Sequence, residues 1–434
     1  MAGRYKAYPE YRESGVKWLE EVPVDWKVSR LKFISSIFGR IGFRGYTTAD
    51  IVDEGEGALV LSPSNVSDGK LDLNSKTFLS WHKYYESPEI IVEPNDILLV
   101  KTGSTFGKSA IVDYSSEPMT INPQMALLKR SKIPPKYLAY VMSSKLIKSL
   151  IDVSNTGSGM PTMTQENINS FPIPLPPSDW AECIANFLDH ETAKIDTLIT
   201  NQEKLIELLK EKRQAVISHA VTKGLNPNAP MKDSGVEWVG EVPKHWVICA
   251  IKRQLKSLDY RRIPLSADER GKRSGEFRYY GASGVIDYID DYIFDEPTVL
   301  VGEDGANLVN RSTPLAFSAF GQYWVNNHAH ILSPKDGLAD YWSEVIEIID
   351  VTPLVSGSAQ PKLTAEALGN LKIAFPPLLE EREAINDFVR NQKIKYDSLT
   401  CKAQQQVKLL KERKTALISA AVTGKIDVRD WESK

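Results

Sequence analysis

Apolar and polar positions alternate with a helical spacing from residue 179 to residue 225. No proline or glycine interrupts residues 180–223, and the apolar positions follow one another in steps of 4, 7, 3, 7, 4 and 7 residues, at Ile184, Leu188, Ile195, Leu198, Leu205, Leu209 and Val216. Such steps are typical of a coiled-coil seam, the row of positions that faces a partner helix. At about 1.5 Å per residue, the pattern predicts one helix of roughly 65 Å. A helix of this length needs a partner to bury its seam.

The partner is predicted in the same chain. The pattern returns 201 residues later, over residues 385–426, with seam positions at Ile385, Val389, Tyr396, Leu399, Leu410 and Leu417. The last turns are nearly copies, LLKEKRQAVISHAVT from residue 208 and LLKERKTALISAAVT from residue 409. Two matched helices in one chain pair most simply in antiparallel orientation, and they would act as a spacer. Polar seam residues would weaken the pair but fix its register, at Gln202, Lys212, Gln406 and Arg413.

The rest of the chain is also duplicated. SGVKWLEEVPVDWKVSRLK from residue 14 recurs as SGVEWVGEVPKHWVICAIK from residue 234, with nine of nineteen positions identical. TGSGMPTMTQENINSFPIPLPP from residue 156 matches SGSAQPKLTAEALGNLKIAFPP from residue 356. The repeat predicts a first body (residues 1–178), a long helix (179–225), a second body (226–378) and a second long helix (379–434). The expected fold is mixed α+β, with two similar globular domains separated by an antiparallel two-helix coiled coil in a pseudo-two-fold internal repeat.

Both bodies are expected to combine strands with short helices. Thr164 and Thr364 are placed as N-caps of short helices, and the proline pairs at 176–177 and 376–377 end those helices before the long ones begin. Strand-like runs are found at residues 89–92, 97–100, 126–128, 285–289, 298–301 and 328–332.

Composition narrows the class of protein. The chain of 434 residues is 42% hydrophobic, which is typical of a soluble globular protein, and it has neither an apolar run of membrane-spanning length nor a signal-peptide core. Its three cysteines are isolated, which favours a reducing cytoplasm and argues against disulfides or a zinc site.

Charge is unevenly distributed, although the net charge is only −3. Residues 252–278 hold nine basic and four acidic side chains, whereas residues 287–304 hold seven acidic ones and no basic one. One face of the second body could therefore contact phosphate. Ordinary solvated loops explain the same distribution about equally well.

The best candidate for an active site is the segment GSTFGKS from Gly103 to Ser109. A phosphate-binding P-loop needs four residues between its glycines, and this segment has three. The equivalent segment of the second body, VGEDG from residue 301, has no lysine. An enzyme that uses a nucleoside triphosphate is therefore a minor alternative.

Other catalytic and metal motifs are incomplete. His328 and His330 would lie on one face of a strand, but no cysteine or acidic cluster stands at a supporting spacing, so a metal site is not expected. The fragment Asn122-Pro123-Gln124 stops short of a methyltransferase tetrad, and Lys101 has no acidic residue at nuclease spacing before it. The sequence predicts no catalytic residues.

Two sets of loops carry side chains suited to nucleic acid. Arginine and lysine bind guanine edges or phosphate, and asparagine and glutamine pair with adenine. The first body offers Arg40, Arg44, Tyr46, Lys101, Ser104, Thr105, Lys108, Asn122 and Gln124. The second body offers Arg261, Arg262, Lys272, Arg273, Tyr280, Ser283, Asn307, Asn326, Asn327 and His328. For any single residue, a solvated or capping role is as plausible as a DNA contact, but similar chemistry in both halves strengthens the joint case.

The chain resembles the DNA-specificity subunit of type I restriction-modification systems. The motifs that carry the resemblance are the W-x-x-E-V-P-x-x-W segment found twice, YYGASGVIDYIDDYIFDEPTVLVGEDGANL from residue 279, WVNNHAHIL from residue 324, and the paired long helices with LLKE near each end. The resemblance covers essentially the whole chain.

The resemblance implies two target recognition domains, each reading one half of a split double-stranded DNA site. It also implies a subunit without catalysis of its own, which docks two methyltransferase subunits and, through them, restriction and translocase subunits. S-adenosylmethionine, ATP and Mg²⁺ would then be bound by those partners and no cofactor by this chain, and no membrane is involved. The tryptophans of the repeated segment are candidate docking residues, because large aromatic side chains anchor subunit contacts: Trp18, Trp26, Trp238 and Trp246.

The geometry of the predicted spacer agrees with this reading. Two half-sites read on one face of a duplex lie about one helical turn, or 34–36 Å, apart. Because the helices are longer than that, the bodies are expected to pack alongside the coil and not on its tips. The loops of the two bodies differ, which predicts an asymmetric DNA site. A coiled-coil scaffold without a DNA role is the remaining alternative.

Overall fold

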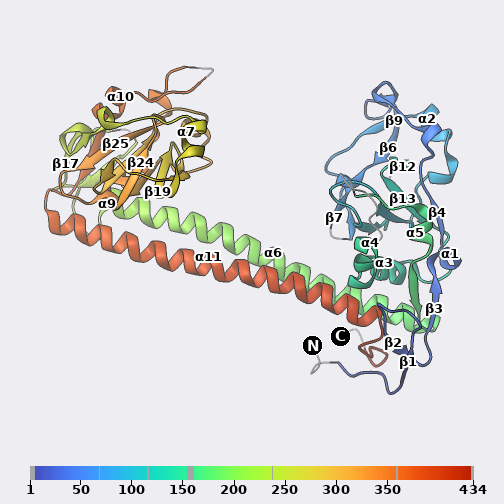
Figure 1. Ribbon diagram of the computed structural model, residues 1–434. Coiled ribbons are helices and arrows are strands. Elements are labelled where there is room, and N and C mark those ends of the chain that lie inside the picture. The colour runs from blue at the N-terminus through green and yellow to red at the C-terminus, as the bar shows by residue number, and fades with distance from the viewer. Residues whose placement is uncertain are drawn as a thin grey trace. The chain divides into compact units, whose positions relative to one another are not determined.

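The computed structural model describes residues 5–67, 69–114, 117–153, 161–236, 238–357 and 360–431. It divides into two compact units (Figure 1). The first unit contains residues 1–202 and 405–434, and the second contains residues 203–404. Each unit thus joins one body to half of helix α6 (Ser178–Lys223) and half of helix α11 (Leu379–Val422).

The first unit is built on two four-stranded sheets. One has the order β11-β10-β13-β4 and is fully antiparallel, with β4 at Ser36–Phe38, β10 at Ile97–Val100, β11 at Ser109–Ile111 and β13 at Met125–Lys129. The other has the order β12-β6-β9-β5, with β5 at Ile51–Val52, β6 at Gly57–Leu61, β9 at Phe78–Ser80 and β12 at Met119–Ile121; β6 and β12 are parallel. Strands β10 and β13 contribute apolar residues to the cores on both sides, which is why they are apolar throughout.

Short elements complete the first unit. Helices α1 (Leu31–Ile34), α3 (Pro135–Ser143), α4 (Lys145–Val153) and α5 (Gln165–Asn169) add to the core, and α3 and α4 lie against the first half of α6 (Figure 1). Helix α2 spans Trp81–Tyr85. Two-stranded ladders join β1 (Tyr11–Glu13) to β2 (Glu21–Pro23), β3 (Lys27–Arg30) to β14 (Pro172–Leu175), and β7 (Val66–Ser67) to β8 (Lys70–Leu71). The two ends of the chain meet here, through a bridge between Lys6 and Asp427.

The second unit repeats this plan. Its antiparallel sheet has the order β18-β25-β22-β23, with β18 at Leu255–Ser257, β22 at Thr298–Gly302, β23 at Ala316–Ala319 and β25 at Ala329–Pro334. Its second sheet has the order β20-β19-β24-β21, with β19 at Ser274–Gly281, β20 at Gly284–Ile289, β21 at Phe294–Asp295 and β24 at Gln322–Val325. Two-stranded ladders join β15 (Met231–Asp233) to β16 (Glu241–Pro243), and β17 (Val247–Ala250) to β26 (Lys372–Phe375). The short helices of this unit are α7 (Ala267–Lys272), α8 (Asn307–Asn310), α9 (Ala339–Glu347) and α10 (Ala365–Asn370).

Most of the local predictions are confirmed. Thr164 and Thr364 each accept a hydrogen bond from a backbone N–H three residues later, at 3.1 Å in both cases, as N-caps do. Five of the six predicted strands are present. The sixth, residues 89–92, is wrong, because Pro88 begins a 3-10 turn over Pro88–Ile90 that buries Ile90 without joining a sheet.

The two long helices run antiparallel in each unit, but the predicted seam needs correction. Leu198 and Leu205 are 48% and 42% exposed, and Leu399 is also exposed. The inward-facing positions of α6 follow steps of 4 and 3 from Ile195 through Ile199, Gln202, Ile206, Leu209, Arg213 and Val216. The predicted step of 3 from Ile195 to Leu198 is wrong, because leucine and isoleucine are both typical seam residues and the seam takes a step of 4 to Ile199.

The polar residues of the seam also differ from those expected. Gln202 is half-buried as predicted, but Lys212, Gln406 and Arg413 are exposed. The polar seam positions are instead Arg213, which pairs with Asp397 at 3.2 Å, and Lys414, which pairs with Asp196 at 2.6 Å. The first pair lies in the second unit and the second pair in the first unit, and the internal repeat relates the two.

Candidate nucleic-acid interface

In each body, the end of one central strand lies beside the start of its antiparallel neighbour, at the equivalent position of the repeat. In the first, Val100 pairs with Met125, and beyond this pair the N–H of Lys101 donates to the carbonyl of Gln124 at 2.9 Å. In the second, the N–H of Glu303 donates to the carbonyl of His328 at 2.9 Å. Residues opposite each other on antiparallel strands project from the same face of a sheet. Lys101 therefore stands beside Gln124, and Glu303 beside His328.

A third segment, which contains Met163 in the first body and Leu363 in the second, is hydrogen-bonded to these strand ends. The N–H of Met163 donates to the carbonyl of Lys101 at 3.0 Å, and the N–H of Leu363 donates to that of Glu303 at 2.8 Å. Next to them, Gly103 has φ +109° and Gly305 has φ +100°, a region that glycine adopts without strain. The two bodies thus share a backbone frame on which the side chains differ.

Two of the predicted amide side chains form turns within this frame. The side-chain oxygen of Asn122 accepts from the N–H of Gln124 at 3.0 Å, and that of Asn326 accepts from the N–H of His328 at 2.8 Å. Both asparagines are buried. Because these bonds shape the turns before β13 and β25, Asn122 and Asn326 support the frame and have little surface to offer to DNA.

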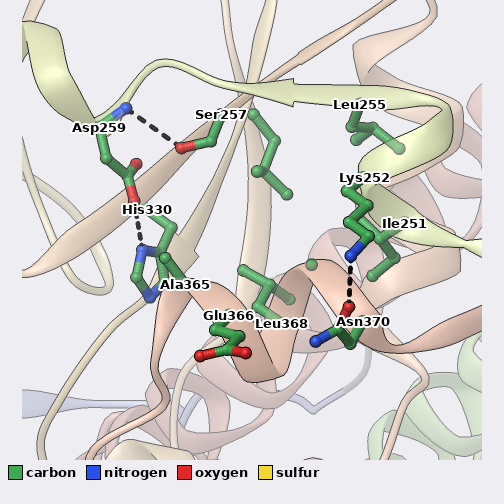
Figure 2. A pocket seen from close by; sticks show the side chains of 12 residues that line it. Ile251, Lys252, Leu255, Ser257, Asp259, His330, Ala365, Glu366, Leu368 and Asn370 are labelled. Carbon is green, nitrogen blue, oxygen red and sulfur yellow. Dashed lines mark hydrogen bonds and ion pairs between the residues drawn. The ribbon is translucent and has the colours of Figure 1, made fainter.

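In the second body, charged side chains pair with one another inside the frame. The Nδ1 of His330 donates to Asp259 at 2.7 Å (Figure 2). Its Nε2 donates to the carbonyl of Leu363 at 2.9 Å, so the ring carries both protons. Burial lowers the pKa of His330, but these hydrogen bonds outweigh burial and raise the pKa above its ordinary value. We call His330, Asp259, Glu303, Arg262 and Lys362 the ionic cluster.

Glu303 is the centre of the ionic cluster. It pairs with Arg262, with Lys362 at 3.2 Å and with His330 at 3.7 Å. Burial would raise the pKa of Glu303, but the hydrogen bond from Arg262 and the surrounding positive charge hold it below its ordinary value. The pKa of Asp259 is lowered in the same way, against its burial, by bonds from His330 and the N–H of Ile331. Arg262 is committed to this cluster, because it also donates to the carbonyl of Ala329 at 2.9 Å.

A cavity of about 240 Å³ lies beside the ionic cluster, between α10 and the edge strand β18 (Figure 2). Its lining includes Lys252, Ser257, Asp259, His330 and Glu366, with apolar residues between them. Ala365 also lines it, and the repeat aligns Ala365 with Gln165 of the first body. There the Gln165 side chain donates to the carbonyl of Ile37 on the edge strand β4 at 2.5 Å. A side chain thus bridges the short helix and the edge strand in the first body, where Ala365 is too short to do so in the second.

The arginine loop of the first body is tied into the fold. Arg40 is 4% exposed, and it donates to the carbonyl of Ile121 at 3.1 Å and to the hydroxyl of Thr120 at 3.0 Å. Its guanidinium also lies over the ring of Tyr46, 5.4 Å from the centroid. Arg44 is partly exposed and pairs with Glu89 at 3.3 Å. Arg40 is therefore a structural residue, whereas Arg44 remains a candidate for DNA contact.

The basic residues of the second body are mostly paired. Arg261 pairs with Glu296, and Arg273 pairs with Asp290 at 2.8 Å. Tyr280 is buried against other aromatic rings, and Asn307 caps its own loop through Thr313. The remaining predicted residues are exposed, apart from half-buried Thr105 and Lys101: Ser104, Lys108, Gln124, Lys272, Ser283, Asn327 and His328.

The tryptophans divide into core and surface. Trp26 and Trp246 are 0% and 1% exposed, so they have no surface for a partner, which corrects the prediction for these two. Trp238 is half-buried. Trp18 is 50% exposed and remains a candidate docking residue.

The geometry also argues against the alternative sites. Lys108 leads into strand β11, whereas a P-loop leads into a helix. His328 faces Asp304 at 2.9 Å and His330 faces Asp259, so the two imidazoles do not converge, and the described residues hold no group of three metal-ligating side chains. Among the described helices, none is long and apolar enough to cross a membrane.

The sequence did not reveal the ionic cluster. Its acidic members and Lys362 lie 44 or more residues apart along the chain. The pairing of β25 with both β18 and β22, and the hydrogen bond from the N–H of Leu363 to Glu303, bring them together. Aligning the two halves could have singled out Glu303, because a lysine stands in the equivalent position. It could not have shown the partners of Glu303.

Comparisons with known proteins agree with this architecture. The family model described as "Type I restriction modification DNA specificity domain" matches residues 23–208 and 252–415. The MjaVIII specificity subunit of a type I restriction enzyme from Methanocaldococcus jannaschii is 26% identical over 446 residues, covering 97% of this chain and 98% of that protein.

Solved structures share the fold. A chain from a structure of complex assembly and conformational transition in the type I R-M system has a TM-score of 0.69 at 15% identity, covering 92% of this chain and 98% of the other. The HsdS subunit from Thermoanaerobacter tengcongensis has a TM-score of 0.53 at 14% identity, covering 93% and 98%.

Proposed function

The chain belongs to the type I restriction-modification DNA specificity family, and on that premise we propose that its two bodies read the two unlike halves of a split DNA site. One observation carries the proposal. The same backbone frame, with the same hydrogen bonds, presents Lys101 and Gln124 in the first body but Glu303 and His328 in the second. A frame kept constant while its side chains change is what two readers of different sequences require.

We also propose that the chain works as a non-catalytic subunit with methyltransferase partners. Two methyltransferase subunits would dock on it, and restriction and translocase subunits would join through them; S-adenosylmethionine, ATP and Mg²⁺ would bind to those partners. Each unit has exposed apolar residues that support docking: Trp18, Leu198 and Leu409 in the first unit, and Leu205, Leu208 and Leu399 in the second. Exposed apolar side chains that form a contiguous patch mark surfaces that partners cover.

DNA footprinting of the chain with its methyltransferase partner tests the reading of a split site. Two protected half-sites with an unprotected gap are expected. A scaffold without a DNA role would leave no footprint, and a single continuous footprint would contradict the division into two readers.

A length change in the coil tests the spacer. One heptad inserted between Asp196 and Lys212 of α6, matched by one at the equivalent place of α11, should change the gap or abolish activity and leave both half-site sequences unchanged. Sequencing of methylated sites in cells that express the whole system measures both quantities. A heptad inserted in α6 alone is the control that breaks the helix pair. Altered half-site sequences in the matched variant would contradict the spacer.

A further inference from the structure

Corresponding positions on one sheet face hold opposite chemistry in the two bodies. Three neighbouring strands of each body contribute one position each to this face. These positions hold Asp259, His330 and Glu303 in the second body, and Gly39, Ala126 and Lys101 in the first. The adjoining loops contribute Arg262 and Lys362 in the second body, where the repeat places Gly42 and Thr162 in the first. The first body thus lacks every partner of the ionic cluster and keeps a single charge.

This single charge, the ammonium of Lys101, has no partner group among the described residues. Lys101 is half-buried, and burial lowers its pKa. Within the described part of the chain, its ammonium makes no hydrogen bond or ion pair. A Cβ added to Gly39 would lie 3.3 Å from the Nζ of Lys101, so the absence of a side chain there leaves room for the ammonium. Burying a charge without a partner costs free energy, so a ligand group that accepts hydrogen bonds from the ammonium would stabilise this site.

The neighbouring amide adds donors of the same kind. Asn122 donates through its Nδ2 to the Oε1 of Gln124 at 3.4 Å, which engages one lone pair of that oxygen. The Nε2 group of Gln124 keeps both protons, and Gln124 is exposed. Lys101 and Gln124 project from the same sheet face, so the ammonium and the amide N–H groups together supply hydrogen-bond donors there.

We propose that Lys101 and Gln124 form a donor site that takes a hydrogen-bond acceptor of the DNA, while the ionic cluster of the second body is an internal lock that does not touch DNA. The proposal rests on the proposed function. Two acceptors on DNA have the required chemistry, a phosphate oxygen and the O6/N7 edge of guanine. A cation that is already paired within the protein, as Arg262 is with Glu303, is not available to either acceptor.

The test compares Lys101→Met with Lys132→Met in the complex of the chain and its methyltransferase partner. Both variants remove one positive charge from the first body, but Lys132 is exposed and is not among the predicted DNA-binding residues. We expect Lys101→Met to weaken DNA binding by about 10- to 100-fold and Lys132→Met to weaken it by less than about 3-fold. Equal losses, or no loss with Lys101→Met, would overturn the proposal.

Two measurements identify the acceptor. If it is a phosphate, Lys101→Met weakens binding to all sequences alike and lowers the slope of log K against log salt by about 1. If it is guanine, the variant tolerates a substituted base at one position of one half-site and keeps full discrimination in the other. Gln124→Leu should shift the same quantity in the same direction.

Thermal unfolding separates this role from a structural one. Because Lys101 has no partner in the fold, Lys101→Met should leave the melting temperature of the unliganded complex unchanged or raise it, and a lowered melting temperature would argue for a structural role. The proposed function and this inference fail differently. A wild-type complex without a split footprint would refute the function, whereas a normal wild-type footprint that Lys101→Met leaves intact would refute only the donor site.

Discussion

Trp26 and Trp246 occupy equivalent places at the ends of the two long helices, and they differ in one bond. Trp26 packs next to Gly424 after α11, and Trp246 next to Gly224 after α6, where a Cβ on either glycine would lie within 3.5 Å of the indole ring. The Nε1 of Trp246 donates to Glu381 at 3.0 Å, whereas the Nε1 of Trp26 is buried without a hydrogen-bond partner among the described residues. The duplication has kept the apolar shape of the joint between body and coil, while its polar partners have diverged.

Polar groups have also diverged at the sheet face that carries the ionic cluster in the second body and Lys101 in the first. There we expect a larger difference in the free energy of unfolding. The ionic cluster stabilises the second unit from within, while Lys101 adds nothing of that kind to the first. Substitutions at equivalent positions should therefore have unequal costs.

Glu303→Gln should have the largest effect. It leaves Arg262, His330 and Lys362 around a neutral group, and removing one member of a buried charged group costs about 3–5 kcal/mol. Lys101→Met at the equivalent position should cost about 0 kcal/mol or stabilise the protein. Urea unfolding of both variants measures the two free energies, and equal costs would show that the bodies do not differ in the way their charges suggest.

The tryptophan pair should show a smaller difference. Trp26→Phe and Trp246→Phe both shrink a buried ring, but only the second loses a hydrogen bond and leaves the carboxylate of Glu381 with fewer donors. Trp246→Phe should therefore cost about 1–2 kcal/mol more than Trp26→Phe. A double-mutant cycle with Glu381→Leu, which removes the acceptor, isolates the bond, and a coupling energy of zero would contradict its contribution.

The alkaline-side pH dependence of stability that comes from His330 should show the smallest effect. The folded pKa of His330 is raised, so its contribution is fully present below its ordinary pKa of about 6.5 and is lost as pH rises through the folded value. Asp259 and Glu303 have lowered pKa values, so their contributions are lost on the acid side. The first body has Ala126 where the second has His330.

Melting curves between about pH 6 and pH 9 measure this dependence, because the ordinary pKa of histidine lies near the lower end of the range. His330→Gln should abolish the loss of stability on the alkaline side, and His328→Gln, two residues away on the exposed turn, should retain it. An unchanged alkaline loss in His330→Gln would assign the titration to another group.

Local patterns predicted the parts of the fold that depend on local physics. The long helices, the N-caps Thr164 and Thr364 and the strand at residues 97–100 each follow from spacing or from a residue type at a helix end. The sequence pattern places the seam at Leu198, one residue before the buried position Ile199, because hydrophobicity alone does not distinguish these two residues.

The candidate site was less predictable, because its contacts are long-range. Arg40 looked like a reader of bases, but Ile121 and Thr120, which accept its hydrogen bonds, lie about 80 residues away in the sequence. Asn122 and Asn326 are predicted DNA contacts because of their amide groups. The side-chain oxygen of each instead accepts a hydrogen bond from the backbone N–H two residues later. Residue type indicated which chemistry was present, and only the pairing of distant strands shows which groups are already satisfied.

The paired charges of the coil couple the lengths of its two helices. Asp196 and Arg213 are 17 residues apart on α6, and Asp397 and Lys414 are 17 residues apart on α11. An insertion in one helix alone would move one pair out of alignment, so viable length variants of such a protein must gain or lose whole heptads in both helices at once. The gap in the DNA site can then change only in discrete increments, and each increment needs two coordinated genetic events.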